Sequence, residues 1–184
     1  MNIDKTLDHK YDIQILEELK QECEIYYYPG ASTQSGKDGV IVQVNPEQGK
    51  TWIGIFAFGN VSKDGFSGVY TTPHTNKLCV VSNGAGYIVS SDNPKDWEEI
   101  KSIPIIDARI SKAQELIIFA DYTELIAYND RGVKWKTKRL SWDNLKIIEL
   151  SNSYIKGEYY DIRSEANEFF EVDLVSGASK GGVE

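Results

Sequence analysis

The side chains with the most versatile chemistry are few in this sequence, and they lie far apart. His9 and His74 are the only histidines, and Cys23 and Cys79 are the only cysteines. Their spacing is not that of a zinc site, whose cysteine and histidine ligands come in closely spaced pairs. The sequence motifs of serine hydrolases, zinc proteases and P-loops do not occur. We therefore predict no catalytic residue, no metal site and no cofactor, and we expect both histidines at the surface.

One glycine cluster, Asn83-Gly84-Ala85-Gly86, has the composition of a loop that could approach a phosphate group. Phosphate-binding loops open a helix, because the helix N-terminus attracts the anion. No helical pattern follows this cluster, and apolar runs flank it on both sides. Asn-Gly between two such runs predicts a tight β-hairpin turn.

Length and charge limit the classes of function. A chain of 184 residues can bury a sizeable core, and we predict one domain spanning residues 1–184. The formal net charge of −8 disfavours nucleic acid as a partner and favours a basic protein. The N-terminus does not resemble a signal peptide, and no apolar run reaches the roughly 20 residues that span a membrane. We expect a cytoplasmic protein without membrane contact; whether Cys23 and Cys79 form a disulfide stays open.

The secondary structure that would position a site is predicted to be helical near the start of the chain and β-strand in the rest. Ile13, Leu16 and Leu19 are three residues apart, with charged residues between them, and Asp12 is a suitable N-cap. This pattern predicts an amphipathic helix over residues 12–24. From residue 25 to residue 184, short runs rich in Val, Ile, Phe, Tyr and Thr alternate with turn residues. Such a texture predicts β-repeats in a sandwich, a barrel or a propeller.

A repeat favours the propeller among these architectures. Shifting the chain by 38 residues without gaps superimposes similar residues, namely Leu78 on Leu116, Ile88 on Ile126, Asp92 on Asp130, and Trp97 on Trp135. A further shift, with one insertion, reaches the C-terminal strands. The chain therefore contains about four units of 38 to 45 residues, each with up to four strands.

Three eight-residue turns recur within these units, at Asn45–Trp52, Ser90–Trp97 and Tyr128–Trp135. Each has an acid at its third position and a Trp at its eighth. These turns resemble degenerate copies of the Asp-box, or BNR repeat, of sialidase-type β-propellers, and the resemblance covers roughly residues 40–180. It implies a turn at the rim of each blade, in which the acid accepts backbone hydrogen bonds, the Gly adopts positive φ and the Trp packs between blades. The structural turn residues that it implies are Gly49, Trp52, Asp92, Trp97, Asp130, Gly132 and Trp135.

We accordingly predict an all-β fold: a small or incomplete β-propeller-like array of about four antiparallel sheets, with one N-terminal helix. Four blades close poorly, so an open arc or self-association with a second chain is expected. A strongly twisted meandering sheet is the alternative architecture.

A sialidase activity is disfavoured by the residues themselves. That family needs three arginines around its substrate, and this chain has four in total, of which Arg131 lies in a predicted rim turn. The Arg-Ile-Pro signature of the family does not occur. Trp142-Asp143 matches the dipeptide of WD repeats, but it occurs once and without the Gly-His that accompanies it there.

Carboxylates gather near the C-terminal end of the sequence. We predict that Asp161, Glu165, Glu171 and Asp173 bind a basic protein partner. The expected function is a non-enzymatic protein-binding module, such as a bacterial immunity protein that neutralises a basic toxin. The alternative is a propeller-type carbohydrate-binding protein or a glycosidase-like enzyme that uses the central face.

Overall fold

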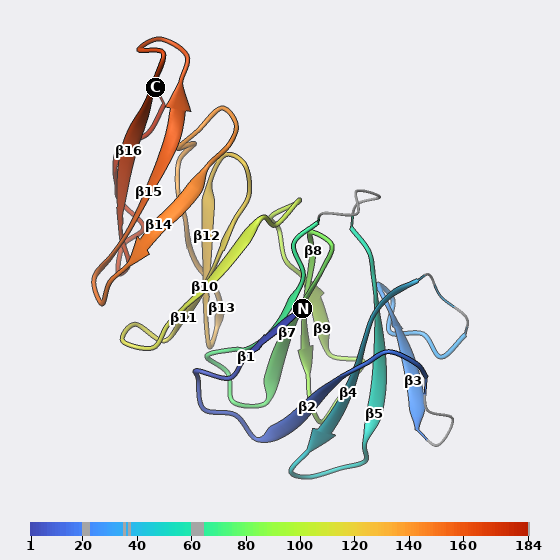
Figure 1. Ribbon diagram of the computed structural model, residues 1–184. Helices are drawn as coiled ribbons and strands as arrows, with labels where there is room; N and C mark the ends of the chain where they lie inside the picture. Colours follow the sequence, from blue (N-terminus) through green and yellow to red (C-terminus); the bar gives the residue numbers. More distant parts are fainter. Residues whose placement is uncertain (20–22, 35, 37, 60–64, 184) are drawn as a thin grey trace. The chain divides into compact units, whose positions relative to one another are not determined.

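The computed structural model describes residues 1–19, 23–34, 36, 38–59 and 65–183. All regular secondary structure in these residues is β-strand, and the strands form four sheets (Figure 1). The chain divides into two units, Met1–Ile103 and Pro104–Glu184, and each unit contains two of the sheets. The all-β prediction is confirmed. No helix long and apolar enough to cross a membrane occurs in the described part of the chain.

The first sheet has the strand order β2-β4-β5-β3. Its strands are β2 (Tyr11–Leu16), β4 (Gly39–Pro46), β5 (Trp52–Ala57) and β3 (Glu24–Tyr28). The pairs β2–β4 and β4–β5 are antiparallel, whereas β3 runs parallel to β5. The edge strand next to β5 is thus β3, which precedes β4 and β5 in the sequence.

The predicted helix over residues 12–24 is wrong in the part of that range that the structure describes; residues 20–22 lie outside it. Asp12 to Leu16 belong to β2, and Glu24 opens β3. Tyr11 and Ile13 are buried while Asp12 and Gln14 are exposed, which is the two-residue period of a strand. Pairing with β4 therefore decides the structure here, and the three-residue spacing of the apolar residues does not.

The second sheet has the order β1-β6-β7-β8-β9. Its strands are β1 (Asn2–Asp4), β6 (Gly68–Thr71), β7 (Lys77–Ser82), β8 (Ala85–Ser90) and β9 (Trp97–Glu99). Strand β1 lies parallel to β6, and the later strands form an antiparallel meander. The predicted hairpin turn is confirmed, because Ser82 pairs with Ala85 across Asn83 (φ 46°) and Gly84 (φ 89°).

The second unit contains two antiparallel meanders whose strands follow in chain order. The third sheet comprises β10 (Asp107–Ser111), β11 (Leu116–Ala120), β12 (Leu125–Asn129) and β13 (Gly132–Lys136). The fourth sheet comprises β14 (Lys146–Leu150), β15 (Tyr154–Asp161), β16 (Ala166–Asp173) and β17 (Ser179–Gly181). Four strands in each of these sheets agree with the predicted repeat.

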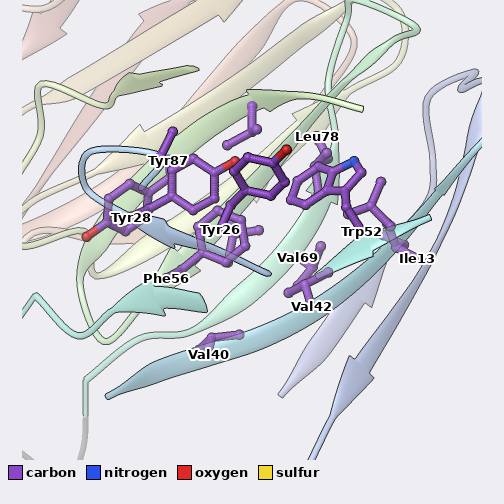
Figure 2. Packing of buried hydrophobic residues seen from close by; sticks show 14 of the residues in the cluster. Ile13, Tyr26, Tyr28, Val40, Val42, Trp52, Phe56, Val69, Leu78 and Tyr87 are labelled. Atoms are coloured by element: carbon purple, nitrogen blue, oxygen red, sulfur yellow. The ribbon is translucent and has the colours of Figure 1, made fainter. Parts of the chain in front are cut away.

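Aromatic rings fill the core of the first unit between its two sheets (Figure 2). Tyr28 and Phe56 stack with their ring centroids 4.6 Å apart, and Tyr87 and Trp52 lie around this pair. Stacked and tilted ring contacts of this kind add to the free energy gained from removing apolar area from water. Strands β3, β5 and β8 are thereby held together.

The core of the second unit lies between the third and fourth sheets. Leu116, Ile118 and Trp135 come from the third sheet, and Ile155 and Phe170 come from the fourth. Along β16 the buried Phe170 and Val172 alternate with the more exposed Phe169, Glu171 and Asp173. One face of the fourth sheet is therefore core, and the opposite face, here called the outer face, is directed away from that core.

Candidate functional site

The four predicted partner-binding residues all lie in the fourth sheet or its turns. Asp161 ends β15, and Asp173 ends β16. Glu165 lies in the turn between these strands, at a φ of 53°. Glu171 and Asp173 share the outer face, as strand alternation requires.

Two of these carboxylates form the turns in which they lie. Asp173 Oδ1 accepts hydrogen bonds from the backbone N–H of Val175 (3.1 Å), the N–H of Ser176 (2.8 Å) and the hydroxyl of Ser176 (2.7 Å). The bond from the Ser176 hydroxyl is the largest of several causes that lower the pKa of Asp173. Asp161 Oδ1 accepts the N–H of Arg163 at 2.9 Å. Asp161 and Asp173 therefore have a structural role in addition to any role in binding.

Glu171 belongs to a row of alternating charges across the outer face. Its carboxylate lies 3.5 Å from the ammonium of Lys156 on β15. On its other side, Lys180 of β17 is the residue opposite Glu171 in the strand register. Lys156 in turn lies opposite Glu149 of β14 in the strand register. The predicted acidic patch is thus interrupted by lysines on both sides of Glu171.

Exposed apolar side chains accompany these charges on the outer face. Phe169 is 66% exposed, Tyr160 is 45% exposed, and Ile148 is 52% exposed. A hollow of about 290 Å³ lies nearby, and Tyr154, Glu171, Asp173 and Lys180 are among the residues that line it. The outer face therefore combines accessible aromatic rings with charges of both signs.

The predicted structural turns lie at comparable places in the second and third sheets. Asp92 lies between β8 and β9, and Asp130 lies between β12 and β13. Trp97 pairs with Val89, and Trp135 pairs with Ala127, so the 38-residue shift holds at these pairs. Asp92 accepts the Ser90 hydroxyl at 2.6 Å.

The third-sheet turn uses Asn129 as its acceptor. Asn129 Oδ1 accepts the N–H of Arg131 at 2.9 Å, which is the role predicted for Asp130. Gly132, with a φ of 115°, supplies the positive φ that the turn requires.

The earliest turn has a different place in its sheet. Gly49 (φ 122°) lies between β4 and β5, so Trp52 opens an internal strand of the first sheet. Its indole N–H donates to Ser91 O at 2.7 Å, just as that of Trp135 donates to Leu174 O at 2.8 Å. Both acceptors directly follow a strand of the other sheet in the same unit.

Burial accounts for the strongly shifted acid–base groups. It raises the pKa of Tyr11 and Tyr28, the pKa of Tyr87 to about 12, and the pKa of the Cys79 thiol. The three phenols donate to backbone carbonyls, Tyr11 to Lys77 at 2.8 Å, Tyr28 to Pro94 at 2.6 Å and Tyr87 to Ala57 at 3.1 Å. The three phenols belong to the core of the first unit and therefore tie it together by both packing and hydrogen bonds.

The candidates considered for metal or redox chemistry lie apart in the described structure. Cys23 and Cys79 are both free thiols. His74 is exposed, and His9 is partly buried with its Nδ1 3.0 Å from Leu7 O. Within the described ranges, no group of three or more His, Cys, Asp or Glu side chains is arranged to hold a metal ion.

Sequence reasoning considered Trp142 only as part of a WD-repeat dipeptide and assigned no site to it. Its side chain is 47% exposed and borders a hollow of about 230 Å³ that Asp161 and Arg163 also line. The guanidinium of Arg139 lies 5.2 Å from the centroid of the Trp142 ring. The available signal was a lone Trp in the polar segment Ser141–Asn144, outside any alternating strand pattern.

In the comparisons with known proteins, matches occur among solved structures. No family model and no curated protein matches this chain. Among solved structures, the N-terminal domain of Nup159 is similar with a TM-score of 0.45 and 10% sequence identity. The alignment covers all of this chain and 53% of that one, so this chain spans about half of its length.

Proposed function

We propose that this chain is a non-enzymatic, cytoplasmic protein-binding module, of the kind represented by an immunity protein that neutralises a basic toxin. The outer face of the fourth sheet is the proposed binding surface. The observation that carries the proposal is the exposure of Phe169 (66%) and Tyr160 (45%) on that face. Exposed aromatic rings are the side chains that most often contribute strongly to protein interfaces.

The charges around these rings favour a protein as the ligand. Lys146 bonds to Glu158 at 3.1 Å, and Lys156 lies 3.5 Å from Glu171, so charge alternates within a small area. A partner with a complementary pattern would be held in one register on such a surface. Phe169 pairs with Glu158 across the strands, and burial of its ring would supply roughly 1.5–3 kcal/mol.

The net charge supports a basic partner at long range. The first unit has 9 Lys and Arg against 14 Asp and Glu, and the second has 11 against 14. Both units are acidic, and the first is the more acidic one. A basic protein would therefore be attracted by the whole chain and positioned by the outer face.

We also propose that the four sheets are blades of an incomplete β-propeller-like array with degenerate Asp-box turns. The indole hydrogen bonds of Trp52 and Trp135 support this, because each joins adjacent sheets within a unit. Completion by a second copy would appear as a dimer in sedimentation equilibrium. A strictly monomeric protein would leave the open arc as the remaining form of the proposal.

Site-specific photo-crosslinking tests the binding function. A photoreactive phenylalanine analogue replaces Phe169 in one variant and Tyr122, a 45% exposed ring outside the outer face, in a control. We expect the Phe169 variant to crosslink one basic protein in cells of the source organism. Equal crosslinking from both positions, or none from Phe169, would contradict the proposed surface.

The glycosidase alternative needs its own measurement. Hydrolysis of a panel of nitrophenyl glycosides by the purified protein would establish an enzyme and overturn the non-enzymatic proposal. We expect no hydrolysis above that of a buffer control.

A further inference from the structure

Trp142 is presented by a turn that is fixed at both ends. The N–H of Ser141 donates to Thr123 O at 3.2 Å, and the N–H of Leu145 donates to Tyr122 O at 3.3 Å. Inside the turn, the N–H of Asp143 donates to the Ser141 hydroxyl at 3.1 Å. The indole is thus 47% exposed on a backbone that is already ordered, so ligand binding would cost little conformational entropy there.

The hollow beside this indole has walls from two further segments of the second unit. Asp161 ends β15, Arg163 lies in the turn after it, and Gly182 and Val183 come from the segment after β17. The bond from Arg163 N–H to Asp161 Oδ1 fixes the first of these walls. The N–H of Val183 donates to Leu140 O at 3.1 Å and fixes the second. The hollow of about 230 Å³ is therefore built from three anchored segments.

The side chains around this hollow have opposite charges. A carboxylate at Asp161 accepts hydrogen bonds only, and a guanidinium at Arg163 donates them only. Any charged ligand would be attracted by one of these groups and repelled by another, because Asp161 is acidic whereas Arg163 and Arg139, which lies over the indole, are basic. A neutral ligand with both donors and acceptors satisfies both groups without leaving a charge unpaired.

The indole adds a requirement for an apolar face. An aromatic face carries partial negative charge, which attracts the partially positive hydrogens of C–H groups. The guanidinium of Arg139 lies over one face of the ring, so a ligand would contact the remaining part of the 47% exposed indole. A pyranose ring has such a C–H face together with neutral hydroxyl groups that donate and accept.

We propose that the Trp142 hollow is a binding site for a neutral saccharide, with the sugar ring on the indole and hydroxyls shared between Asp161 and Arg163. This site is separate from the outer-face residues Phe169 and Glu171, so it adds a second ligand class to the proposed protein-binding function.

Titration of the intact protein with glucose, galactose and mannose, each up to about 100 mM, tests this site, since contacts of this size give millimolar affinity. Binding is followed by the shifts of the Trp142 indole and Val183 amide signals in ¹H–¹⁵N spectra. We expect at least one sugar to shift both signals in a saturable way. Trp142→Ala should weaken that binding at least about tenfold. Phe169→Ala, a matched change of an exposed ring outside the hollow, should leave it unchanged.

Three results would overturn the proposal. One is the absence of saturable shifts with all three sugars. Another is unchanged binding in Trp142→Ala while its circular dichroism matches that of the wild type. The third is tighter binding of glucuronate or glucosamine than of glucose, because it would show that the hollow selects a charge.

Discussion

Trp52 in the first unit and Trp135 in the second have the same structural role. Trp52 and Trp135 bury their rings in the cores, at 3% and 7% exposure, and each indole N–H donates to a backbone carbonyl that directly follows a strand of the other sheet in its unit. A buried N–H without an acceptor would cost about 1–3 kcal/mol. The hydrogen bond therefore allows a large ring to fill the core and joins two sheets at the same time.

Trp135→Ala should lower the free energy of unfolding by about 3–5 kcal/mol, the usual cost of truncating a buried large aromatic side chain. Trp135→Phe should cost about 1–3 kcal/mol, because the Leu174 carbonyl loses its donor while most of the ring remains. Lys136→Ala is the control; its ammonium pairs with Glu124 at 2.6 Å on the surface, and its loss should cost at most about 1 kcal/mol. Urea melts measure all three, and similar losses for Trp135→Ala and Lys136→Ala would show that the assignment of faces is wrong.

The buried tyrosines predict a loss of stability in alkali. In the unfolded chain a phenol ionises with a pKa near 10, whereas burial raises the pKa of Tyr87 in the folded protein to about 12. Its contribution is fully present below about pH 10 and is lost as the pH rises through about 12. Urea melts at stepped pH should show a shallower decline for Tyr87→Phe than for the wild type. Identical slopes would mean that Tyr87 ionises equally in both states.

At the scale of elements, a hairpin turn places the edge strand β17 in the fourth sheet. Between β16 and β17, the Asp173 carboxylate holds the N–H groups of Val175 and Ser176. In the same turn, Gly177 has a φ of 72°, and a β-carbon there would lie 2.7–2.8 Å from atoms of Trp135. A side chain is therefore excluded both by the backbone conformation and by the ring beneath it.

Gly177→Ala should cost about 2–4 kcal/mol, from the strained backbone and from overpacking against Trp135. Gly177→Asn separates the two causes, because Asn tolerates this backbone conformation better than Ala does. We expect Asn to be at least as destabilising as Ala in urea melts, since it places the same β-carbon against the indole. A clear recovery of stability with Asn would show that only the backbone conformation matters.

At an exposed position of β2, a β-branched residue should give a more stable protein than Ala, whereas in a helix the order of stability would be reversed. Gln14 is exposed on β2 and pairs with Gln43. Gln14→Thr should be neutral or slightly stabilising, and Gln14→Ala should destabilise by up to about 1 kcal/mol, because strands favour β-branched residues. Thermal melts of the two variants measure the difference. A more stable Ala variant would indicate the helix that the apolar spacing suggested.

Local pattern and pairing explain which parts of the fold could be predicted. Turn residues such as Asn83-Gly84 and Gly132, with apolar runs between them, specify hairpins through contacts close in sequence. The strand at Tyr11–Leu16 could not be assigned this way, because its partner β4 lies some thirty residues later. The hollow at Trp142 was missed for a related reason: it is assembled from the segment after β13, the end of β15 with the turn that follows, and the segment after β17.

At the scale of the whole molecule, we propose that net charge and the outer face have different roles in binding. The net charge of −8 acts over several ångströms and should raise the rate at which a basic partner arrives. The outer face, with Phe169 and the Lys156–Glu171 pair, should set how long the partner stays. Neutralising Asp173 would confuse the two effects, because its carboxylate also holds a turn.

The most direct test of the binding function is surface plasmon resonance at low and at physiological salt. The ligand is the basic partner that the crosslinking experiment identifies, in its free form. We predict that the association rate of the wild type falls as salt rises, because surface charge steers the encounter. Glu171→Gln should lower the association rate at low salt and change the dissociation rate less. Phe169→Ala should mainly speed dissociation. Association that is independent of salt and unchanged in Glu171→Gln would contradict a basic partner at the outer face.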